Sequence, residues 1–361
     1  LLTWIGWQQL DPARALPITV AVLVISCPCA LSLATPAALI AATGRLARLG
    51  ILVTKGHALE TLARITDAVF DKTGTLTEGR PCITAIATFS GNENRARELA
   101  GALEATSAHP LAQAFQLPGV AAAQNARLHP GSGISGWING DEYAIGNPAF
   151  IKTFCGSPPP EGIAADWLYL ASRQQWLAGF CIADTIRADS TAAVAGLQMH
   201  GIASHILSGD QPETVARIAQ AIGITDFRAA ATPEDKLTHL ASLQQSGRIV
   251  LMVGDGVNDA PVLATANVSM AMGSGVDVAH AAGDTVLLGN QLAHLPAAVR
   301  VARFTRRIIR QNLIWALSYN AIALPLAVGG YVTPWLASLG MAASSLLVVL
   351  NAPRITRLEE N

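Results

Sequence analysis

One aspartate stands directly after a short apolar run in the first quarter of the chain. Asp71 follows residues 68–70, which are typical of a buried strand, and begins the sequence DKTGT. A carboxylate at the end of a strand can act as a nucleophile toward phosphorus. The same position also suits a helix N-cap, for which Asp is a preferred residue. Asp71 alone does not decide between these two roles.

A second acidic group follows another apolar run. Residues 249–253 are followed by a glycine-rich turn that contains Asp255, Asn258 and Asp259. Carboxylate oxygens suit Mg²⁺, which keeps part of its water shell and shares phosphate oxygens. This turn favours the nucleophile interpretation of Asp71 and predicts a magnesium site.

Two further polar groups fit the same chemistry. Ser208 follows the run 205–207 and offers a hydroxyl, and Lys236 can neutralise a transferring phosphoryl group. The carboxyl ends of parallel strands meet at one edge of a sheet. We therefore expect these side chains to lie together at a phosphoryl-transfer site.

A different chemistry is indicated near the N-terminus, where Cys27 and Cys29 flank Pro28 in an uncharged stretch. Side chains two residues apart point to different faces of a regular helix. Pro28 removes a backbone hydrogen bond and can unwind the turn, which lets both thiolates converge. Paired thiolates favour soft ions such as Cu(I), or Zn²⁺. The alternative is two small apolar side chains in a packed helix.

The pattern of the middle of the chain predicts an α/β domain that positions the carboxylates. Apolar runs at 68–70, 180–183, 205–207 and 249–253 end at special residues, and helical segments 212–222 and 233–245 lie between them. This pattern is typical of a doubly wound parallel sheet. Residues 83–178 interrupt it and contain a hairpin signal at 138–141. They predict a second, inserted domain.

Uncharged stretches flank this α/β part. No Asp, Glu, Lys or Arg occurs in residues 15–44 or 311–353. These stretches predict one membrane span at 16–42 and two more at 312–328 and 335–350. Arginines beside all three spans place residues 45–310 on the cytoplasmic side. Buried core helices are the alternative.

Composition agrees with a membrane protein. Hydrophobic residues make up 51% of the 361 residues and charged residues 14%, whereas soluble domains carry about 25% charged residues. The net charge of −1 gives no reason to expect a nucleic acid partner. Five cysteines are too few for a disulfide scaffold. Because the chain opens at Leu1 inside apolar sequence, we expect a piece of a longer protein; a processed mature chain is the alternative.

The sequences DKTGTLT at 71–77 and GDGVNDAP at 254–261 resemble those of the P-type ATPases, whose fold is haloacid dehalogenase-like. The resemblance implies that ATP phosphorylates Asp71, with Mg²⁺ held by Asp71, the Thr73 carbonyl and Asp255. Ser208, where the family usually has Thr, and Lys236 would contact the phosphoryl group. Asn258 and Asp259 would support the site.

Thr73 separates two activities of this fold. Phosphatases of the fold generally carry a second Asp two residues after the nucleophile, where this chain has Thr73. Without a general base, water attacks an aspartyl phosphate slowly. Thr73 therefore weighs against a simple phosphatase.

The inserted domain resembles the nucleotide-binding domain of heavy-metal P-type ATPases, an α+β domain. Residues 131–136 match GxGxxG but precede a hairpin-like segment, so they do not indicate a Rossmann fold. The resemblance implies ATP binding by Glu104, His109, Gly131, Gly133 and Asn147. Ala108 departs from the Glu that many copper ATPases carry before the histidine.

The later uncharged stretch resembles the Cu(I)-exporting branch of that family. Asn312, Tyr319-Asn320 and Pro325 form N-x6-YN-x4-P, and residues 341–345 form MxxSS. The Zn²⁺/Cd²⁺ branch is expected to have an Asp in the last span, which residues 335–350 lack. Residues 41–60 also resemble the FixI/CcoI group. The implied Cu⁺ ligands are Cys27, Cys29, Tyr319, Asn320, Met341 and Ser345.

The resulting domain map follows chain order. We expect the tail of a span at 1–9, a Cys-Pro-Cys transmembrane helix at 10–44, and a stalk with the first part of the phosphorylation domain at 45–82. The nucleotide-binding domain follows at 83–178, the rest of the phosphorylation domain at 179–298, two transmembrane helices at 299–353 and a cytoplasmic tail at 354–361.

The resemblance covers only the C-terminal half of the family architecture, and no Thr-Gly-Glu of an actuator domain occurs. The implied partners are the missing N-terminal half, membrane lipid and a copper chaperone, and the implied location is a bacterial inner membrane. The leading hypothesis is a Cu(I)-translocating ATPase that cannot complete transport alone. A phosphatase and a non-catalytic copper-binding fragment of a decayed pump are the alternatives.

Overall fold

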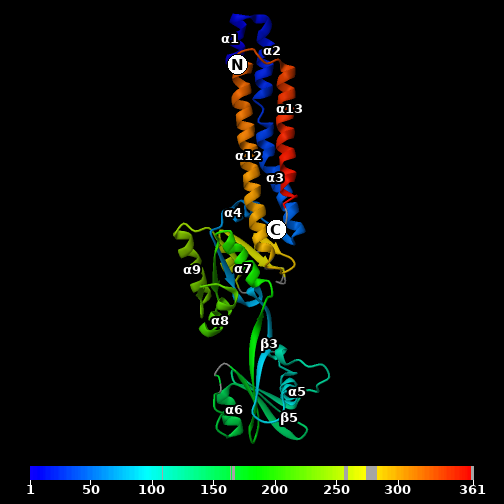
Figure 1. The fold of residues 1–361 in the computed structure, drawn as a ribbon, viewed down its shortest axis with the longest axis vertical. Helices are drawn as coiled ribbons and strands as arrows, with labels where there is room; N and C mark the ends of the chain where they lie inside the picture. The colour runs from blue at the N-terminus through cyan, green and yellow to red at the C-terminus, as the bar shows by residue number, and fades with distance from the viewer. Residues whose placement is uncertain (108, 163, 165–166, 256–258, 274–282, 359–361) are drawn as a thin grey trace. The chain divides into compact units, whose positions relative to one another are not determined.

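The computed structural model describes residues 1–361 apart from 108, 163, 165–166, 256–258, 274–282 and 359–361 (Figure 1). The chain forms two compact units. One unit contains Leu1–Thr75 with Ala188–Asn361, and the other contains Leu76–Arg187. No observation tests the predicted boundaries 83–178 of the inserted domain, which stay a prediction.

The first unit contains a seven-stranded sheet in the order β1-β13-β12-β11-β2-β9-β10, and every neighbouring pair is parallel except β1 with β13. The strands are β1 (Ile51–Val53), β2 (Asp67–Asp71), β9 (Ala203–Leu207), β10 (Asp226–Arg228), β11 (Val250–Gly254), β12 (Val268–Met272) and β13 (Thr285–Leu287). The helices connected to the sheet are α4 (Ala58–Leu62), α7 (Ser190–Met199), α8 (Pro212–Ile222), α9 (Pro233–Gln245) and α10 (Ala260–Thr265).

Apolar sequence explains the centre of this sheet. Every residue of β2, β11 and β12 is buried, as expected for parallel strands covered on both faces. Side chains of β2 and β11, such as Val69 and Met252, pack in one cluster with Leu240 of α9 and Leu263 of α10. The predicted α/β fold is confirmed, and α8 and α9 coincide with the predicted helices 212–222 and 233–245.

The first unit also contains a helical bundle. It comprises α1 (Leu2–Leu10), α2 (Pro12–Ile25), α3 (Cys29–Arg48), α12 (His294–Val328), α13 (Pro334–Asn351) and the turn η3 (Ala352–Ile355). Helices α2 and α3 pack against α12 and α13 (Figure 1). Helix α12 also contacts α4 and α7, and α3 contacts β1, so both helices connect the bundle to the sheet.

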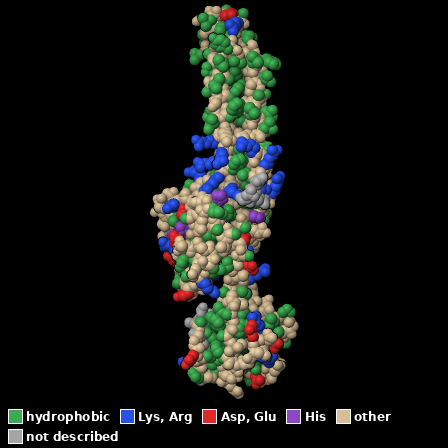
Figure 2. Space-filling model, viewed as in Figure 1, with side chains coloured by type: hydrophobic (Ala, Val, Ile, Leu, Met, Phe, Trp, Pro, Cys, Tyr) green, Lys and Arg blue, Asp and Glu red, His purple; other side chains and the backbone are tan. Residues whose placement is uncertain are grey.

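The bundle buries small residues and exposes large apolar ones. Alanines lie at its contacts, such as Ala34 on α3 and Ala316 on α12, whereas Leu23, Ile40 and Leu346 are exposed. Figure 2 shows hydrophobic side chains over the outside of the bundle. Small residues at helix contacts and apolar residues outside are typical of helices in lipid.

Two segments of the described chain are long and apolar enough to cross a membrane, Pro12–Arg48 and Pro334–Ile355. The third predicted span, 312–328, lies in α12 and is not among them, and α1 has only nine residues. The predicted span at 312–328 and the predicted tail of a span at 1–9 therefore stay predictions.

The second unit is a six-stranded antiparallel sheet in the order β3-β8-β7-β6-β5-β4. Its strands are β3 (Thr77–Thr88), β4 (Gln124–His129), β5 (Gly133–Ile138), β6 (Asp141–Gly146), β7 (Leu168–Ser172) and β8 (Trp176–Ile186), and its helical segments are α5 (Glu93–Glu104), η2 (Pro110–Phe115) and α6 (Pro148–Cys155). The prediction that 180–183 belong to the parallel sheet is wrong, because they lie in β8 and pair with β3. The hydrophobicity of a short run does not distinguish a strand of the parallel sheet from a strand of the antiparallel sheet.

Candidate functional site

Three strand ends bring the predicted phosphoryl-transfer residues together. Strand β2 lies between β9 and β11 and is parallel to both. Asp71 is the last residue of β2, Ser208 follows β9, and Asp255 follows β11. The three residues therefore lie at the same edge of the sheet, as the sequence pattern predicts.

Lys236 connects two carboxylates at this edge. Its Nζ donates to Oδ1 of Asp71 at 2.7 Å and to Oδ1 of Asp259 at 2.8 Å. All three residues are less than a tenth exposed. Thr232 caps α9 through reciprocal hydrogen bonds with Asp235, which fixes the first turn of the helix that carries Lys236.

The charges at this edge do not balance. Burial and the charge of Asp259 raise the pKa of Asp71 to about 7, although Lys236 opposes the shift. Burial alone would lower the pKa of Lys236, but the attraction of Asp71 and Asp259 outweighs it and raises that pKa. Two buried carboxylates against one ammonium leave an excess of negative charge, which a divalent cation would neutralise.

The donor set of Asp71, Asp255 and the Thr73 carbonyl fits Mg²⁺. Asp255 lies against the turn 72–76, because a Cβ placed on Gly74 would be 3.4 Å from its Oδ2. Within the described part of the chain, no three His, Cys, Asp or Glu side chains form a metal cluster. Magnesium does not need one, since waters and phosphate oxygens complete its shell.

Sequence reasoning missed one ion pair beside this site. Lys72 is buried and pairs with Asp210, which is 40% exposed. The pair joins the turn after β2 to the loop after β9, where Oγ of Ser208 accepts a hydrogen bond from the Asp210 amide at 3.2 Å. Lys72 stands in the sequence DKTGT and Asp210 two residues after Ser208, but nothing in the sequence pairs them. Asn258 lies outside the described residues.

In the second unit, the five predicted nucleotide-binding residues line one cavity of about 230 Å³: Glu104, His109, Gly131, Gly133 and Asn147. Burial raises the pKa of the Glu104 carboxyl, against the opposing effects of Ser107 and His109. Apolar side chains such as Leu128 and Ile145 line the same cavity. Apolar walls with few polar groups are typical of small-molecule sites.

Two of these residues shape the cavity. A Cβ on Gly133 would lie 2.2 Å from the Ile145 carbonyl oxygen, so only glycine fits where β5 meets β6. The Asn147 side chain donates to the Gly131 carbonyl at 3.2 Å and accepts from the Phe150 amide at 2.8 Å. Asn147 therefore positions the loop and caps α6. Residues 133–138 form a strand, which confirms that this GxGxxG does not open a Rossmann helix.

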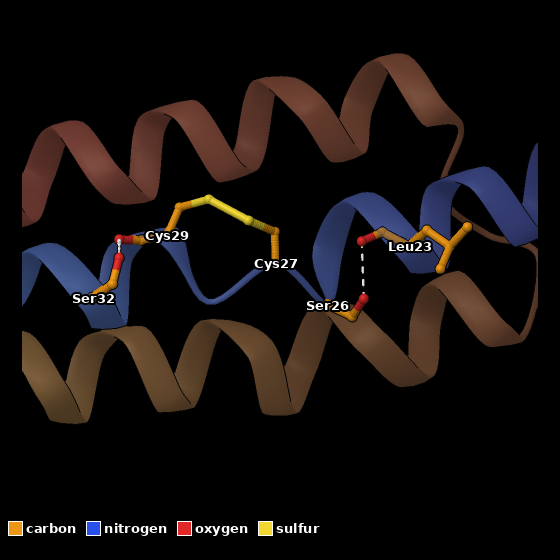
Figure 3. The surroundings of a disulfide bond; sticks show 5 residues. All are labelled: Leu23, Ser26, Cys27, Cys29 and Ser32. Atoms are coloured by element: carbon orange, nitrogen blue, oxygen red, sulfur yellow. Dashed lines mark hydrogen bonds between the residues drawn. A yellow bond between two sulfur atoms is a disulfide. The ribbon is translucent and has the colours of Figure 1, made fainter.

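The helical path from α2 to α3 is interrupted at the cysteine pair. Helix α2 ends at Ile25 and α3 begins at Cys29, and a disulfide joins Cys27 to Cys29 (Figure 3). Hydroxyls of Ser26 and Ser32 donate to the carbonyls of Leu23 and Cys29, both at 2.9 Å, on either side of the break. The predicted unwinding and convergence of the two sulfurs are confirmed. Metal binding would require the reduced pair, since the thiolate is the ligand.

Two packing clusters bracket this break. On one side, Ile25 packs with Ala327 of α12 and Ala337 of α13, and on the other, Ala34 packs with Ala316 and Val348. The segments between these contacts carry the other predicted ligands, Tyr319, Asn320, Met341 and Ser345. The six predicted copper ligands thus occupy one layer of the bundle. Sequence reasoning missed Ser344, whose buried hydroxyl has no hydrogen-bond partner among the residues that the structure describes.

Comparison with known proteins identifies the family. Residues 68–267 match the haloacid dehalogenase-like hydrolases. The chain belongs to this family. Among these hydrolases, it is related over nearly all its length to P-type ATPases. It is 37% identical to a copper-exporting P-type ATPase of Mycobacterium tuberculosis over 99% of this chain and 48% of that protein.

Two other relatives show the same relationship. The nitrogen fixation protein FixI of Rhizobium meliloti is 39% identical over 99% of this chain and 47% of its own. The crystal structure of a zinc-transporting PIB-type ATPase in its E2.Pi state superposes with a TM-score of 0.85 at 36% identity, over 97% of this chain and 59% of that one. The chain spans about half the length of the curated relatives it matches.

Proposed function

We propose that this haloacid dehalogenase-like chain is the catalytic and metal-passage half of an ATP-driven Cu(I) transporter that forms an aspartyl phosphate at Asp71. The observation that carries the proposal is the buried Asp71 carboxylate held by Lys236 at the carboxyl edge of the parallel sheet. The relatives include a copper-exporting P-type ATPase and a zinc-transporting PIB-type ATPase, and this chain covers 48% of the first and 59% of the second.

In the proposed step, an oxygen of Asp71 forms a bond to the γ-phosphorus of ATP. The bond from that phosphorus to the bridging oxygen breaks, and ADP leaves with the electron pair. Lys236 and Ser208 bind the phosphoryl oxygens, while Asp71, Asp255 and the Thr73 carbonyl would hold a magnesium ion. When bound, magnesium neutralises charge on the phosphates and draws the carboxylate and phosphate together.

Thr73 supports a pump over a phosphatase. It is exposed beside the nucleophile and offers no carboxylate that could activate water. A long-lived aspartyl phosphate can be coupled to a conformational change, whereas a rapidly hydrolysed one cannot.

Cu(I) is the proposed cargo, because one layer of the bundle carries two cysteines, a thioether and neutral oxygen donors. Helix α13 contains no acidic residue that would favour Zn²⁺. A bacterial inner membrane, an N-terminal half that supplies the actuator domain and a copper chaperone complete the proposal. These three stay predictions from the family resemblance.

The test is phosphorylation of the purified chain by γ-labelled ATP and Mg²⁺, with Cu(I), with Zn²⁺ or without metal. We expect acid-stable, hydroxylamine-sensitive label that is absent in Asp71→Asn and lost on chelation of Mg²⁺. Cu(I) dependence that disappears in Cys27→Ser/Cys29→Ser would tie the label to the bundle. Stimulation by Zn²⁺ alone would overturn the choice of metal. Absence of label also in the full-length gene product would favour the non-catalytic alternative.

A further inference from the structure

A cavity of about 610 Å³ lies in the first unit among α3, α4 and α12. Its lining changes character along the helices. Leu39 and Leu313 come from the uncharged stretches of α3 and α12, whereas Arg64 and Arg310 come from the charged sequence beside them. The cavity therefore has an apolar end beside the candidate spans and a basic end away from them.

The basic end is built by one face of α12. Arg303, Arg306, Arg307 and Arg310 are spaced i, i+3, i+4 and i+7, which places them on the same side of a helix. Arg64, two residues after the end of α4, lines the cavity with them. Figure 2 shows Lys and Arg side chains gathered at the base of the bundle.

These arginines lack internal counter-charges. Among the described residues that line the cavity, Glu60 is the one acidic residue. In the described part of the chain, no carboxylate forms an ion pair with Arg64, Arg306, Arg307 or Arg310. Arg303 donates to the His200 carbonyl at 2.9 Å. Like charges at i and i+4 destabilise a helix, so an anion bound here would relieve repulsion along α12.

We propose that this cavity binds the headgroup of an anionic phospholipid. The phosphate lies against the arginines of α12, and the glycerol and the first part of the acyl chains lie along Leu39 and Leu313. A free phosphate would use the basic end only, whereas a phospholipid uses both ends and arrives from the side on which the candidate spans lie. Basic pockets between helices at the cytoplasmic face are typical lipid-headgroup sites. The proposal goes beyond the transport function, since neither phosphorylation nor the metal ligands involve this cavity.

Binding can be measured on the detergent-solubilised chain, without ATP or copper, by native mass spectrometry. The probes are dioctanoyl-phosphatidylglycerol, dioctanoyl-phosphatidylcholine and inorganic phosphate. We expect one phosphatidylglycerol to bind saturably, with little binding of phosphatidylcholine and no displacement by millimolar phosphate. Arg306→Gln/Arg310→Gln should weaken binding by about 25-fold, at about fivefold for each arginine.

The matched control is Arg48→Gln/Arg357→Gln. It removes the same charge from exposed arginines at the end of α3 and just after η3, outside the cavity lining. A second variant, Leu39→Trp, fills the apolar end while leaving every arginine in place, and it should also weaken binding.

If Arg48→Gln/Arg357→Gln weakens phosphatidylglycerol binding as much as Arg306→Gln/Arg310→Gln does, the lipid is attracted by diffuse surface charge, and the proposed site is overturned. Equal binding of both lipids, or displacement by free phosphate, would overturn the assignment to an anionic headgroup. Because the assay contains no ATP or copper, a negative result here leaves the proposed phosphorylation standing, and the converse also holds.

Discussion

Lys236 is the cation between two buried carboxylates, and removing its charge should destabilise the sheet edge. The oxygens of Asp71 and Asp259 that it contacts lie at most about 5.5 Å apart, from the two hydrogen-bond lengths of 2.7 and 2.8 Å. At an effective dielectric constant of about 20, two like charges at that distance repel by about 3 kcal/mol. This value agrees with the cost of about 3–5 kcal/mol for removing one partner from a buried ion pair. We therefore expect Lys236→Met to cost about 3 kcal/mol of local stability near pH 8.

The loss should depend on pH in a defined direction. Burial already raises the folded-state pKa of Asp71 from 3.8 to about 7. Between those values the folded state binds more protons than the unfolded state, so stability falls as pH rises through this window. Without the ammonium, the pKa of Asp71 should rise further. The penalty of Lys236→Met should then shrink as the pH is lowered toward 5, because Asp71 takes up a proton.

Hydrogen exchange in peptides from β2 and β11 is the suitable assay, because a chain with two units does not unfold in one transition. A loss of about 3 kcal/mol corresponds to exchange that is faster by about two orders of magnitude. Lys72→Met is the control, since its partner Asp210 is 40% exposed and can be solvated; we expect a cost of about 1 kcal/mol.

The double variant Lys236→Met/Asp259→Asn provides the decisive comparison. It removes one of the two facing carboxylates and should recover most of the protection. If exchange in Lys236→Met accelerates less than fivefold, or if Asp259→Asn restores nothing, the repulsion argument is refuted.

Three further predictions follow from other contacts. His205→Leu removes the imidazole whose ring nitrogens contact Asp67 at 3.0 Å and Asp226 at 2.9 Å. It leaves Asp67 buried, so exchange in β2 and β9 should reveal a loss of about 3 kcal/mol; no acceleration there would contradict this. Gly133→Ala should abolish ATP-analogue binding by calorimetry, because its Cβ would lie 2.2 Å from a carbonyl oxygen, whereas Gly131→Ala, with open space, should cost only about 1–2 kcal/mol. Equal effects of the two substitutions would refute the steric argument. Thr73→Asp should shorten the lifetime of the aspartyl phosphate in a chase experiment by about 100-fold or more, by supplying a general base; an unchanged lifetime would count against the role assigned to Thr73.

The sheet-edge site could be predicted from sequence because local signals coincide there. Each of the strands β2, β9 and β11 is parallel to its neighbours and ends at or just before a polar residue. The location of Asp71, Ser208 and Asp255 at one edge of the sheet could therefore be predicted without knowing the strand order. The Cys-Pro-Cys break was predictable for the same reason, since proline acts on its own turn.

Other features depend on contacts between distant segments. The run 180–183 is as apolar as a parallel strand, and only its pairing with β3 places it in the second sheet. Likewise, the ion pair of Lys72 with Asp210 joins loops more than a hundred residues apart. Ser344 is buried and Ser345 is half-buried, although both belong to the same motif, because burial depends on which face α13 turns toward its neighbours.

Helix α12 connects the two chemistries of the first unit. At about 1.5 Å per residue, its 35 residues span about 50 Å. Its second half carries Tyr319 and Asn320 beside the break in α2 and α3, and its first half packs against α4 and α7. Helix α4 in turn ends five residues before β2, the strand that carries Asp71. Under the proposed function, a rearrangement of the Asp71 loop would reach the predicted copper ligands through α4 and the unbroken α12, and also through α3, which runs from Cys29 to its contacts with β1. Helix α12 passes the cysteine pair unbroken, whereas α3 begins at Cys29, so under the proposed function α12 is the continuous link between the Asp71 side of the unit and the predicted ligands Tyr319 and Asn320.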